Sequence, residues 1–306
     1  MMAKQKITDI LKTGKILVSD GAWGTFLYQK GLQPGECPDV WSLTHYDAVK
    51  AIAQCYFDAG ADMVETNSFG ANRFKLQHYG LQDKVWEINE AAARASREAA
   101  GADRYVIASI GPTGQMLLMG DVTEDELFDN FCEQAMALEK GGADAICIET
   151  MSDADEAVQA IKAAKENTGL EVITTFTFDK TQQGEYRTMM GLSPTDAIRA
   201  ALEAGADMIG TNCGNGMERM IDIVKEIRAE FPDTFVLVHT NAGLPVLVDR
   251  VDTFPETPQI MASYVPALLE AGVNIVGGCC GTTPEHIRAI RQAVDFQNYI
   301  RNLVTN

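Results

Sequence analysis

The chain has 306 residues, of which 46% are hydrophobic and 22% charged, and this balance is typical of a globular protein rather than a disordered or fibrous one. Its formal net charge of −18 argues against nucleic-acid binding, which needs a basic surface, and against docking on anionic membranes. The polar segment 1–15 lacks the apolar core of a signal peptide, and no apolar run reaches the roughly 18 residues of a membrane span.

Apolar runs of strand length alternate with helical stretches along the whole chain. Their continuous Val- and Ile-rich composition is typical of parallel strands that are covered on both faces. Between them, the spacing of apolar residues changes to that of a helix, as in residues 49–57. In chain order, the predicted strands are 16–19, 63–66, 105–110, 145–149, 172–178, 208–212, 235–240 and 274–277.

A weak internal repeat supports this count of strands. Four short segments share a glycine followed by Ala or Val and then Asp or Asn, and each closes a predicted helix just before a strand. A glycine is expected where a helix ends in the left-handed conformation. The segments are 58–62, 140–144, 203–207 and 270–274.

The spacing of these segments indicates the fold class. A mean separation of about 70 residues corresponds to two βα units, and eight such units form a barrel. We therefore predict a single-domain α/β protein, a (β/α)8 TIM barrel that spans residues 1–306. A doubly wound open sheet is the alternative, but it would normally carry a glycine-rich phosphate loop after its first strand, and residues 20–25 match such a loop poorly.

Cysteines stand at two of the predicted strand ends. Cys213 follows the sixth strand, and the adjacent Cys279 and Cys280 follow the eighth. In a barrel, the carboxyl ends of the strands converge on one mouth. Three thiolates there can ligate one zinc ion and leave its fourth tetrahedral position open, as in catalytic zinc sites. Because neighbouring strand residues point to opposite faces, we expect a sharp turn at Cys279, which the surrounding glycines permit.

Seven cysteines without regular pairing are typical of a reducing compartment, so we expect a cytoplasmic protein.

The other cysteines and the histidines are weaker candidates for metal ligands. Cys37 lies in a Pro- and Gly-rich loop and has no assigned role. His239 lies within a strand, and His286, just inside the last helix, is expected to be solvated. We expect three cysteines to be buried small hydrophobic residues: Cys55, Cys132 and Cys147.

Two carboxylates at strand ends suggest an amino-acid site. Asp20 and Glu149 follow apolar residues, and a buried carboxylate needs a partner, which a substrate ammonium would supply. The alternative is that groups of the barrel itself pair with them. The turn at Gly21 and Ala22 can present backbone N–H groups to a substrate carboxylate. Three further polar residues near strand ends are candidates for secondary contacts: Thr66, Asn67 and Asn241.

Seven segments, spread over nearly the whole chain, resemble the homocysteine S-methyltransferase family. Residues 66–70 (TNSFG) and 111–114 (GPTG) are most similar to the zinc- and homocysteine-binding module of cobalamin-dependent methionine synthase. The segments are 20–25, 65–73, 111–114, 148–150, 212–213, 241–243 and 277–284. The resemblance implies these site residues: Cys213, Cys279 and Cys280 for zinc, and Asp20, Gly21, Ala22 and Glu149 for homocysteine.

The resemblance also implies a reaction. A free thiol has a pKa of about 8.5 and is only slightly ionised at neutral pH, whereas a zinc-bound thiol loses its proton without a protein base. Homocysteine would then be methylated to methionine as a zinc thiolate. The expected methyl donor is methylcobalamin or another corrinoid, carried by a separate domain or protein. Methionine synthases continue into further modules, whereas this sequence stops at Asn306, so we expect a fragment or a free-standing subunit.

Several alternatives remain open at this point. One alternative donor is a small molecule such as S-methylmethionine or betaine, and one alternative acceptor is another thiol or a selenol. A protein of a different class would use the zinc site or the Cys279–Cys280 pair for redox sensing without catalysis. Residues 116–119 and 189–190 offer an apolar rim for a corrinoid, although we expect these side chains to cover the core.

Overall fold

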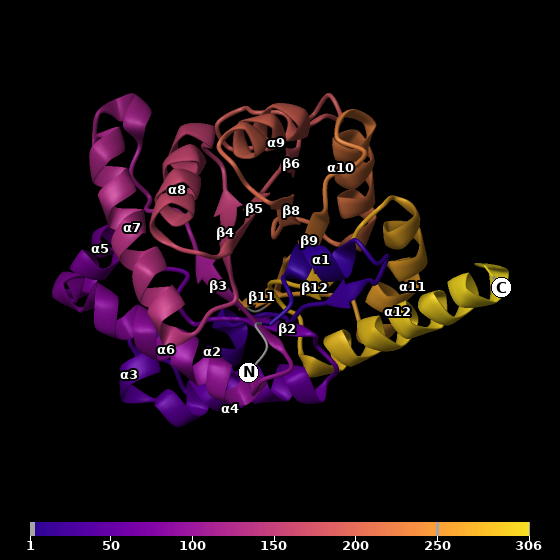
Figure 1. Ribbon diagram of the computed structural model, residues 1–306, viewed down its shortest axis with the longest axis horizontal. Coiled ribbons are helices and arrows are strands. Elements are labelled where there is room, and N and C mark those ends of the chain that lie inside the picture. The colour runs from indigo at the N-terminus through magenta and orange to yellow at the C-terminus, as the bar shows by residue number, and fades with distance from the viewer. Residues whose placement is uncertain (1–3, 249–250, 306) are drawn as a thin grey trace.

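Eight strands form one parallel sheet in the order β1-β12-β9-β8-β5-β4-β3-β2 (Figure 1). The computed structural model describes residues 4–248 and 251–305. Each predicted strand overlaps an observed one, and the ends differ by a few residues at most, so the predicted (β/α)8 barrel is confirmed. The strands are β1 (Leu17–Val18), β2 (Met63–Glu65), β3 (Tyr105–Ile110), β4 (Ala145–Met151), β5 (Glu171–Phe176), β8 (Met208–Asn212), β9 (Val236–Thr240) and β12 (Ile275–Gly278).

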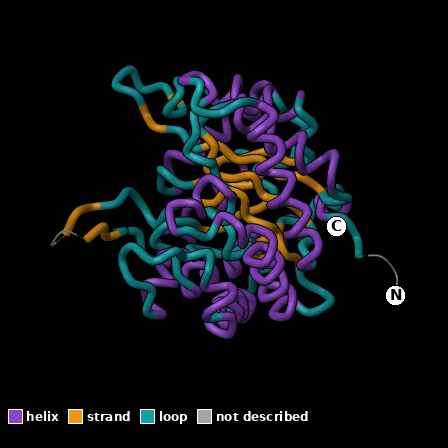
Figure 2. Tube along the Cα trace, turned by 90° about the vertical axis from the view of Figure 1, so that its left-hand side faces the viewer, coloured by secondary structure: helices purple, strands orange, loops and turns teal. Residues whose placement is uncertain are grey.

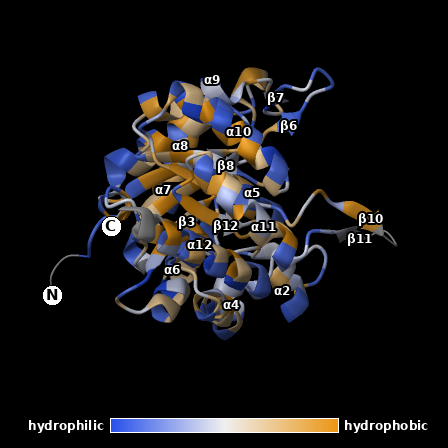
Figure 3. Cartoon of the chain, turned by 90° about the vertical axis from the view of Figure 1, so that its right-hand side faces the viewer, coloured by the Kyte–Doolittle hydropathy of each residue, from blue (hydrophilic) through white to orange (hydrophobic). Residues whose placement is uncertain are grey.

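Helices surround the barrel and cover its outer face (Figures 1 and 3). Several of them begin with a capping residue: Thr123 forms a capping box with Glu126, and Ser193 precedes a proline at the first helical position. The longer helices are α4 (Tyr46–Asp58), α6 (Val85–Ala100), α7 (Glu124–Gly141), α8 (Ala154–Asn167), α9 (Pro194–Glu203), α10 (Met217–Glu230), α11 (Pro258–Glu270) and α12 (Pro284–Thr305). The shorter ones are α1 (Ile7–Leu11), α2 (Gly24–Lys30), α3 (Trp41–Thr44), α5 (Arg73–Leu76), η1 (Gln77–Tyr79), η2 (Gln82–Lys84) and η3 (Leu117–Met119).

The barrel interior is apolar at one end and polar at the other. Along β4, Ala145, Cys147 and Glu149 alternate with residues that pack toward the helices, as the two-residue period of a strand requires. Ala145 and Cys147 belong to an inner apolar cluster that includes Ile7 and Leu11 of α1. The N–H of Ile7 donates to Glu171 at the start of β5 over 2.7 Å, so α1 closes the N-terminal end of the barrel.

The four repeat segments have the same structural role: each ends a helix and bonds the next strand to its neighbour. Gly142 ends α7 with φ 102°, and Asp144, two residues later, accepts a hydrogen bond from the N–H of Val106 over 2.8 Å. Arg97 packs across the glycine and pairs with the same carboxylate. Each Asp or Asn therefore ties the start of its strand to the neighbouring one. The other three positions are Asp62 with Arg291, Asp207 with Lys165, and Asn274 with Arg228.

Side-chain carboxylates help to join β1 to β2, the two ends of the strand order. Asp62 accepts from the N–H of Val18 over 2.9 Å and donates its own N–H to the carbonyl of Val18 over 2.7 Å. Nearer the carboxyl ends, Asp20 accepts from the N–H of Glu65 over 2.8 Å. Asp20, which the sequence analysis places in a substrate site, therefore also helps to hold β1 against β2.

Two antiparallel hairpins project from the barrel on the side away from both termini (Figure 2). One is formed by β6 (Asp179–Lys180) and β7 (Tyr186–Arg187), the other by β10 (Val246–Val248) and β11 (Val251–Thr253). They follow β5 and β9, so they lie on the face that holds the carboxyl ends of the strands. Across residues 4–248 and 251–305, no helix combines the length and the apolar character that crossing a membrane requires.

Close packing between β8 and β9 predicts a large effect of a small substitution. A Cβ atom on Gly210 would lie 1.9 Å from the carbonyl oxygen of Leu237, a backbone atom that cannot move without shifting β9. We expect Gly210→Ala to lower the free energy of unfolding by about 3 kcal/mol, measured by urea denaturation. Gly24→Ala is the control, because an added Cβ there meets no atom within 4 Å. Equal stability of the two variants would contradict the prediction.

Candidate metal and substrate site

The structure brings the three strand-end cysteines together at the carboxyl face of the barrel. Cys213 follows β8, and Cys279 and Cys280 follow β12, with β9 between these two strands. The Sγ atoms all lie within 4.8 Å of one another, and those of Cys213 and Cys280 are 3.8 Å apart. Tetrahedral coordination with Zn–S bonds of about 2.3 Å needs sulfur atoms about 3.8 Å apart. The cluster therefore has the dimensions of a three-thiolate zinc site.

The backbone around the cysteines is bent to achieve this. Cys213 has φ 57°, a left-handed conformation that costs a non-glycine residue about 1–3 kcal/mol and is concentrated at functional sites. Its N–H donates to the carbonyl of His239 over 3.0 Å, which fixes it against β9. The expected sharp turn follows β12, where Gly281 has φ 79° and a Cβ would collide with Phe254.

The three thiols influence one another strongly. Hydrogen bonds from Cys279 and Cys280 lower the pKa of Cys213 to about 3, and Asn241 contributes a further bond from its side chain. The contact with Cys213 in turn raises the pKa of Cys280 to about 12 and that of Cys279 well above its ordinary value. One thiolate is thus stabilised by two thiols, and a divalent cation would be needed to hold all three as thiolates.

A cavity of about 500 Å³ opens beside the cysteines, within the size range of small-molecule sites. The sulfur cluster lies in its wall together with buried carboxylates, and Phe69, Lys75 and Tyr79 also line it. Several predicted residues contribute to the lining: Gly21, Ala22, Thr66, Asn67, Glu149, Cys213, Cys279 and Cys280.

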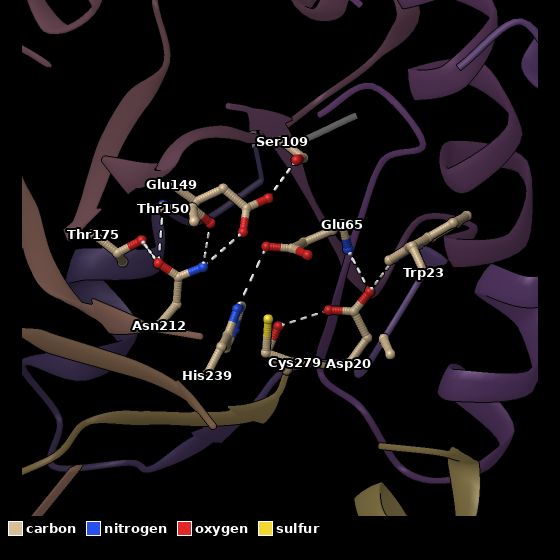
Figure 4. Close-up of polar contacts among 12 residues, drawn as sticks. Asp20, Trp23, Glu65, Ser109, Glu149, Thr150, Thr175, Asn212, His239 and Cys279 are labelled. Atoms are coloured by element: carbon tan, nitrogen blue, oxygen red, sulfur yellow. Dashed lines mark hydrogen bonds and ion pairs between the residues drawn. The ribbon is translucent and has the colours of Figure 1, made fainter. Parts of the chain in front are cut away.

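Glu149 is held in this cavity by a network of hydrogen bonds (Figure 4). Ser109 donates to one carboxylate oxygen, and Asn212 donates to the other over 3.1 Å. Asn212 is itself fixed, because its oxygen accepts from the N–H of Thr150 over 2.9 Å and from the hydroxyl of Thr175 over 2.8 Å. Burial raises the pKa of Glu149 well above its ordinary value. A cationic ligand would relieve this cost.

Asp20 has a different environment. It is fully buried, and its side chain does not belong to the cavity lining. Its oxygens accept from the indole N–H of Trp23 over 2.8 Å, the N–H of Glu65 over 2.8 Å and the hydroxyl of Ser19 over 3.0 Å. Asp20 thus has the barrel partners that the alternative interpretation predicts. Its carboxylate holds the turn that begins at Gly21.

Thr282 links the predicted substrate turn to the cysteine loop. Its hydroxyl accepts from the N–H of Ala22 over 3.1 Å and donates to the carbonyl of Cys279 over 2.7 Å. A Cβ on Gly21 would lie 2.6 Å from this hydroxyl, which explains the glycine. One of the two N–H groups expected to face a substrate carboxylate is therefore already bonded.

The secondary candidates have mainly structural contacts. Thr66 accepts from the N–H of Ser109 over 3.0 Å, and Asn67 donates to the carbonyl of Pro38 over 2.8 Å. The N–H of Asn241 donates to the carbonyl of Asn215 over 3.0 Å, while its side chain contacts Cys213. Among the three, Asn241 is the residue that acts directly on the sulfur cluster.

One expectation from the sequence is wrong, and another holds only in part. His286 is 7% exposed rather than solvated, because the turn before α12 folds it onto the chain: it accepts from the N–H of Thr283 and bonds the carbonyl of Glu256. The methionine-rich loops cover the core only in part. Leu117 packs against the core, whereas Leu118, Met119 and Met189 are 79%, 69% and 87% exposed.

The cysteines outside the cluster divide into two groups. All seven cysteines are free thiols. Cys147 is fully buried, as predicted, whereas Cys55 and Cys132 are only half-buried. Cys37 is buried with its Sγ 3.8 Å from a carboxylate oxygen of Asp39.

The buried carboxyl group of Asp39 should make the free energy of unfolding depend on pH. Burial raises its pKa to about 6, although the N–H of Gly70 donates to it over 2.9 Å. Because the pKa is higher in the folded state, the fold is favoured by protonation: the contribution is complete below pH 4 and is lost as pH rises through 6. We expect Asp39→Asn to gain about 2 to 3 kcal/mol relative to wild type between pH 4 and pH 7.5. Denaturant unfolding at both pH values measures this, and a pH-independent difference would contradict it.

Sequence reasoning gave no role to five residues that line the cavity or support its lining. Glu65, Ser109 and His239 line the cavity, whereas Asn212 and Thr282 bond the lining residues Glu149 and Ala22. Glu65 stands at the carboxyl end of β2, and in a barrel such strand ends surround the mouth. The inward positions of Ser109 and His239 follow from strand alternation once the strand ends are known. Their hydrogen-bond partners do not, because they come from other strands.

Comparison with known proteins places this site in a family. The sequence model of the homocysteine S-methyltransferase family matches residues 17–294. The chain belongs to the homocysteine S-methyltransferase family. This membership confirms the family resemblance that the seven sequence segments indicate.

Relatives agree with this assignment, and a solved structure shares the fold. Methionine synthases of Mycobacterium leprae and Mycobacterium tuberculosis are 35% and 33% identical to the chain over 94% of its length. The alignment covers 25% of each of those proteins, so the chain spans about a quarter of their length. The homocysteine methyltransferase MmuM from Escherichia coli, in its oxidized form, shares the fold with a TM-score of 0.78 and 20% identity, covering 94% of this chain and 99% of that one.

Proposed function

We propose that this protein binds a zinc ion through Cys213, Cys279 and Cys280 and methylates the thiol of homocysteine, which gives methionine. The observation that carries the proposal is the meeting of three Sγ atoms within 4.8 Å in the wall of a cavity that also contains buried carboxylates. A thiolate donor set suits zinc, and three protein ligands leave a fourth position for a substrate. One structure of MmuM is described as a metallated form.

The chemistry follows from this arrangement. Bound zinc would keep the homocysteine thiol deprotonated at neutral pH. The substrate sulfur attacks the methyl carbon of the donor: the S–CH3 bond forms, the bond between methyl and donor breaks, and its electron pair stays with the donor. The proton lost from the thiol passes to solvent.

The chain's own residues bind and orient the amino acid. Glu149, fixed by Ser109 and Asn212, offers a carboxylate to the substrate ammonium. Asp20 holds the turn at Gly21 and Ala22 in place, and this turn lies in the cavity lining beside Cys279. Homocysteine would thus place its amino-acid group on the carboxylate side of the cavity and its thiol beside the sulfur cluster.

The proposed donor is a methyl-corrinoid such as methylcobalamin, carried by a separate domain or protein. The two mycobacterial methionine synthases that the chain matches are about four times as long as this chain. The exposed side chains of Leu118, Met119 and Met189 support an apolar contact near the barrel mouth. The free cysteines support a reducing, cytoplasmic location.

X-ray absorption of the zinc-loaded protein, with and without homocysteine, tests the proposal. The number of sulfur ligands is expected to rise from three to four when homocysteine is added. A zinc site that does not respond would overturn the proposal and favour a non-catalytic zinc or redox sensor. A donor panel of methylcobalamin, S-methylmethionine, S-adenosylmethionine and betaine then identifies the methyl source; activity with a small donor alone would exclude the corrinoid.

A further inference from the structure

A second buried carboxylate faces the cavity, and the proposed function does not yet use it. Glu65 at the end of β2 and His239 in β9 both line the cavity, and both are buried. Glu65 Oε1 and His239 Nδ1 are 3.4 Å apart (Figure 4). The ring of His239 fits there because β12 has a glycine opposite it: a Cβ on Gly277 would lie 2.9 Å from His239 Nε2.

Glu65 lacks the hydrogen bonds that its neighbours have. Its Oε1 atom accepts no hydrogen bond from any residue in the described part of the chain. The Nε2 atom of His239 has no hydrogen-bond partner among these residues either. By contrast, two donors hold Glu149, and three hold Asp20. A buried carboxylate oxygen without a donor is costly, typically by a few kcal/mol, unless a ligand supplies the donor.

The carboxyl groups of Glu65 and Glu149 also point toward one another across the cavity (Figure 4). Burial, followed by the charge of Asp20, raises the pKa of Glu65 well above its ordinary value. Burial, followed by the charge of Glu65, raises the pKa of Glu149 in the same way. Two facing carboxylates repel each other unless a proton or a cation lies between them. An ammonium group has three N–H donors and a positive charge, so it satisfies both.

We infer that Glu65 and Glu149 form a clamp for the α-ammonium group of the substrate, with His239 as the positioning residue that orients Glu65. This inference rests on the proposed function and deepens it. It states that one residue from β2 and one from β4 together let the site bind an amino acid in preference to a simple thiol. Asp20, behind Glu65, supports the clamp through the N–H of Glu65. Lys75 is the one Lys or Arg among the described residues that line the cavity, and it is the candidate for the substrate carboxylate.

The test compares two ligands that differ only in the ammonium group: homocysteine and 4-mercaptobutanoate. Their dissociation constants are measured by calorimetry on the zinc-loaded protein. We expect Glu65→Gln to weaken homocysteine binding about tenfold to a hundredfold and to leave 4-mercaptobutanoate unchanged. His239→Gln is expected to reduce the preference for homocysteine by a smaller factor, because Glu65 keeps its charge but loses its orientation.

Glu156→Gln is the matched control. Glu156 is also a buried glutamate with a raised pKa, but it bonds Thr113 and does not line the cavity. Zinc content and circular dichroism are measured for every variant, and if Glu65→Gln does not fold, the ligand preference of His239→Gln decides. An unchanged preference in a folded, zinc-loaded variant would overturn the inference. Failure of the wild type to bind homocysteine at all would instead overturn the proposed function.

Discussion

Replacing Cys280 by alanine is expected to abolish zinc binding and methyl transfer together. Its Sγ lies 3.8 Å from that of Cys213, so the variant leaves two sulfur ligands where three are proposed. Removing a residue that only hydrogen-bonds a metal ligand weakens metal binding by about tenfold to a hundredfold. Removing a ligand itself should therefore lower the zinc affinity by more than about a hundredfold. Metal analysis after dialysis and an assay with methylcobalamin measure the two effects. Cys213→Ala should behave in the same way.

Cys132→Ala provides the control for this experiment. Cys132 is a free, half-buried cysteine of α7, outside the sulfur cluster. It should retain wild-type zinc content and activity. If the Cys280 variant still transferred methyl groups in metal-free form, the three-cysteine mechanism would be wrong.

Replacing Glu149 by alanine is expected to raise the KM for homocysteine about a hundredfold and to leave zinc occupancy almost unchanged. A charged hydrogen bond to a buried carboxylate contributes about 1.5 to 3 kcal/mol, and this substitution removes it together with the proposed clamp. The carboxylate bonds Ser109 and Asn212 rather than a cysteine, so the sulfur cluster should persist. Steady-state kinetics and metal analysis on the same preparation separate the two effects.

Glu149→Gln sharpens the interpretation. The amide keeps the size of the side chain and one oxygen, so it removes charge with little change of packing. A large rise in KM in this variant would assign the effect to charge. Loss of zinc from either variant would show instead that Glu149 supports the metal site rather than the amino acid.

The architecture and the meeting of the three cysteines follow from the order of residues along the chain. Eight Val- and Ile-rich runs separated by about 35 residues favour a barrel of parallel strands, and parallel strands place all carboxyl ends on one face. Cys213 and Cys280 are 67 residues apart in the chain, yet their strand-end positions alone brought them to the same mouth. The glycine and Asp or Asn of the repeat likewise act locally, at the end of a helix and the start of the next strand.

Which carboxylate faces the cavity depends on how the strands pack in three dimensions. Asp20 and Glu65 both stand at strand ends, but Asp20 turns into the junction of β1 and β2, where it accepts from the N–H of Glu65, and Glu65 is left in the cavity wall. The partners of Glu149 and His239 also come from other strands. Hydrogen-bond pairing across a barrel depends on the register and inward direction of several strands at once, and residue spacing along one chain does not encode that directly.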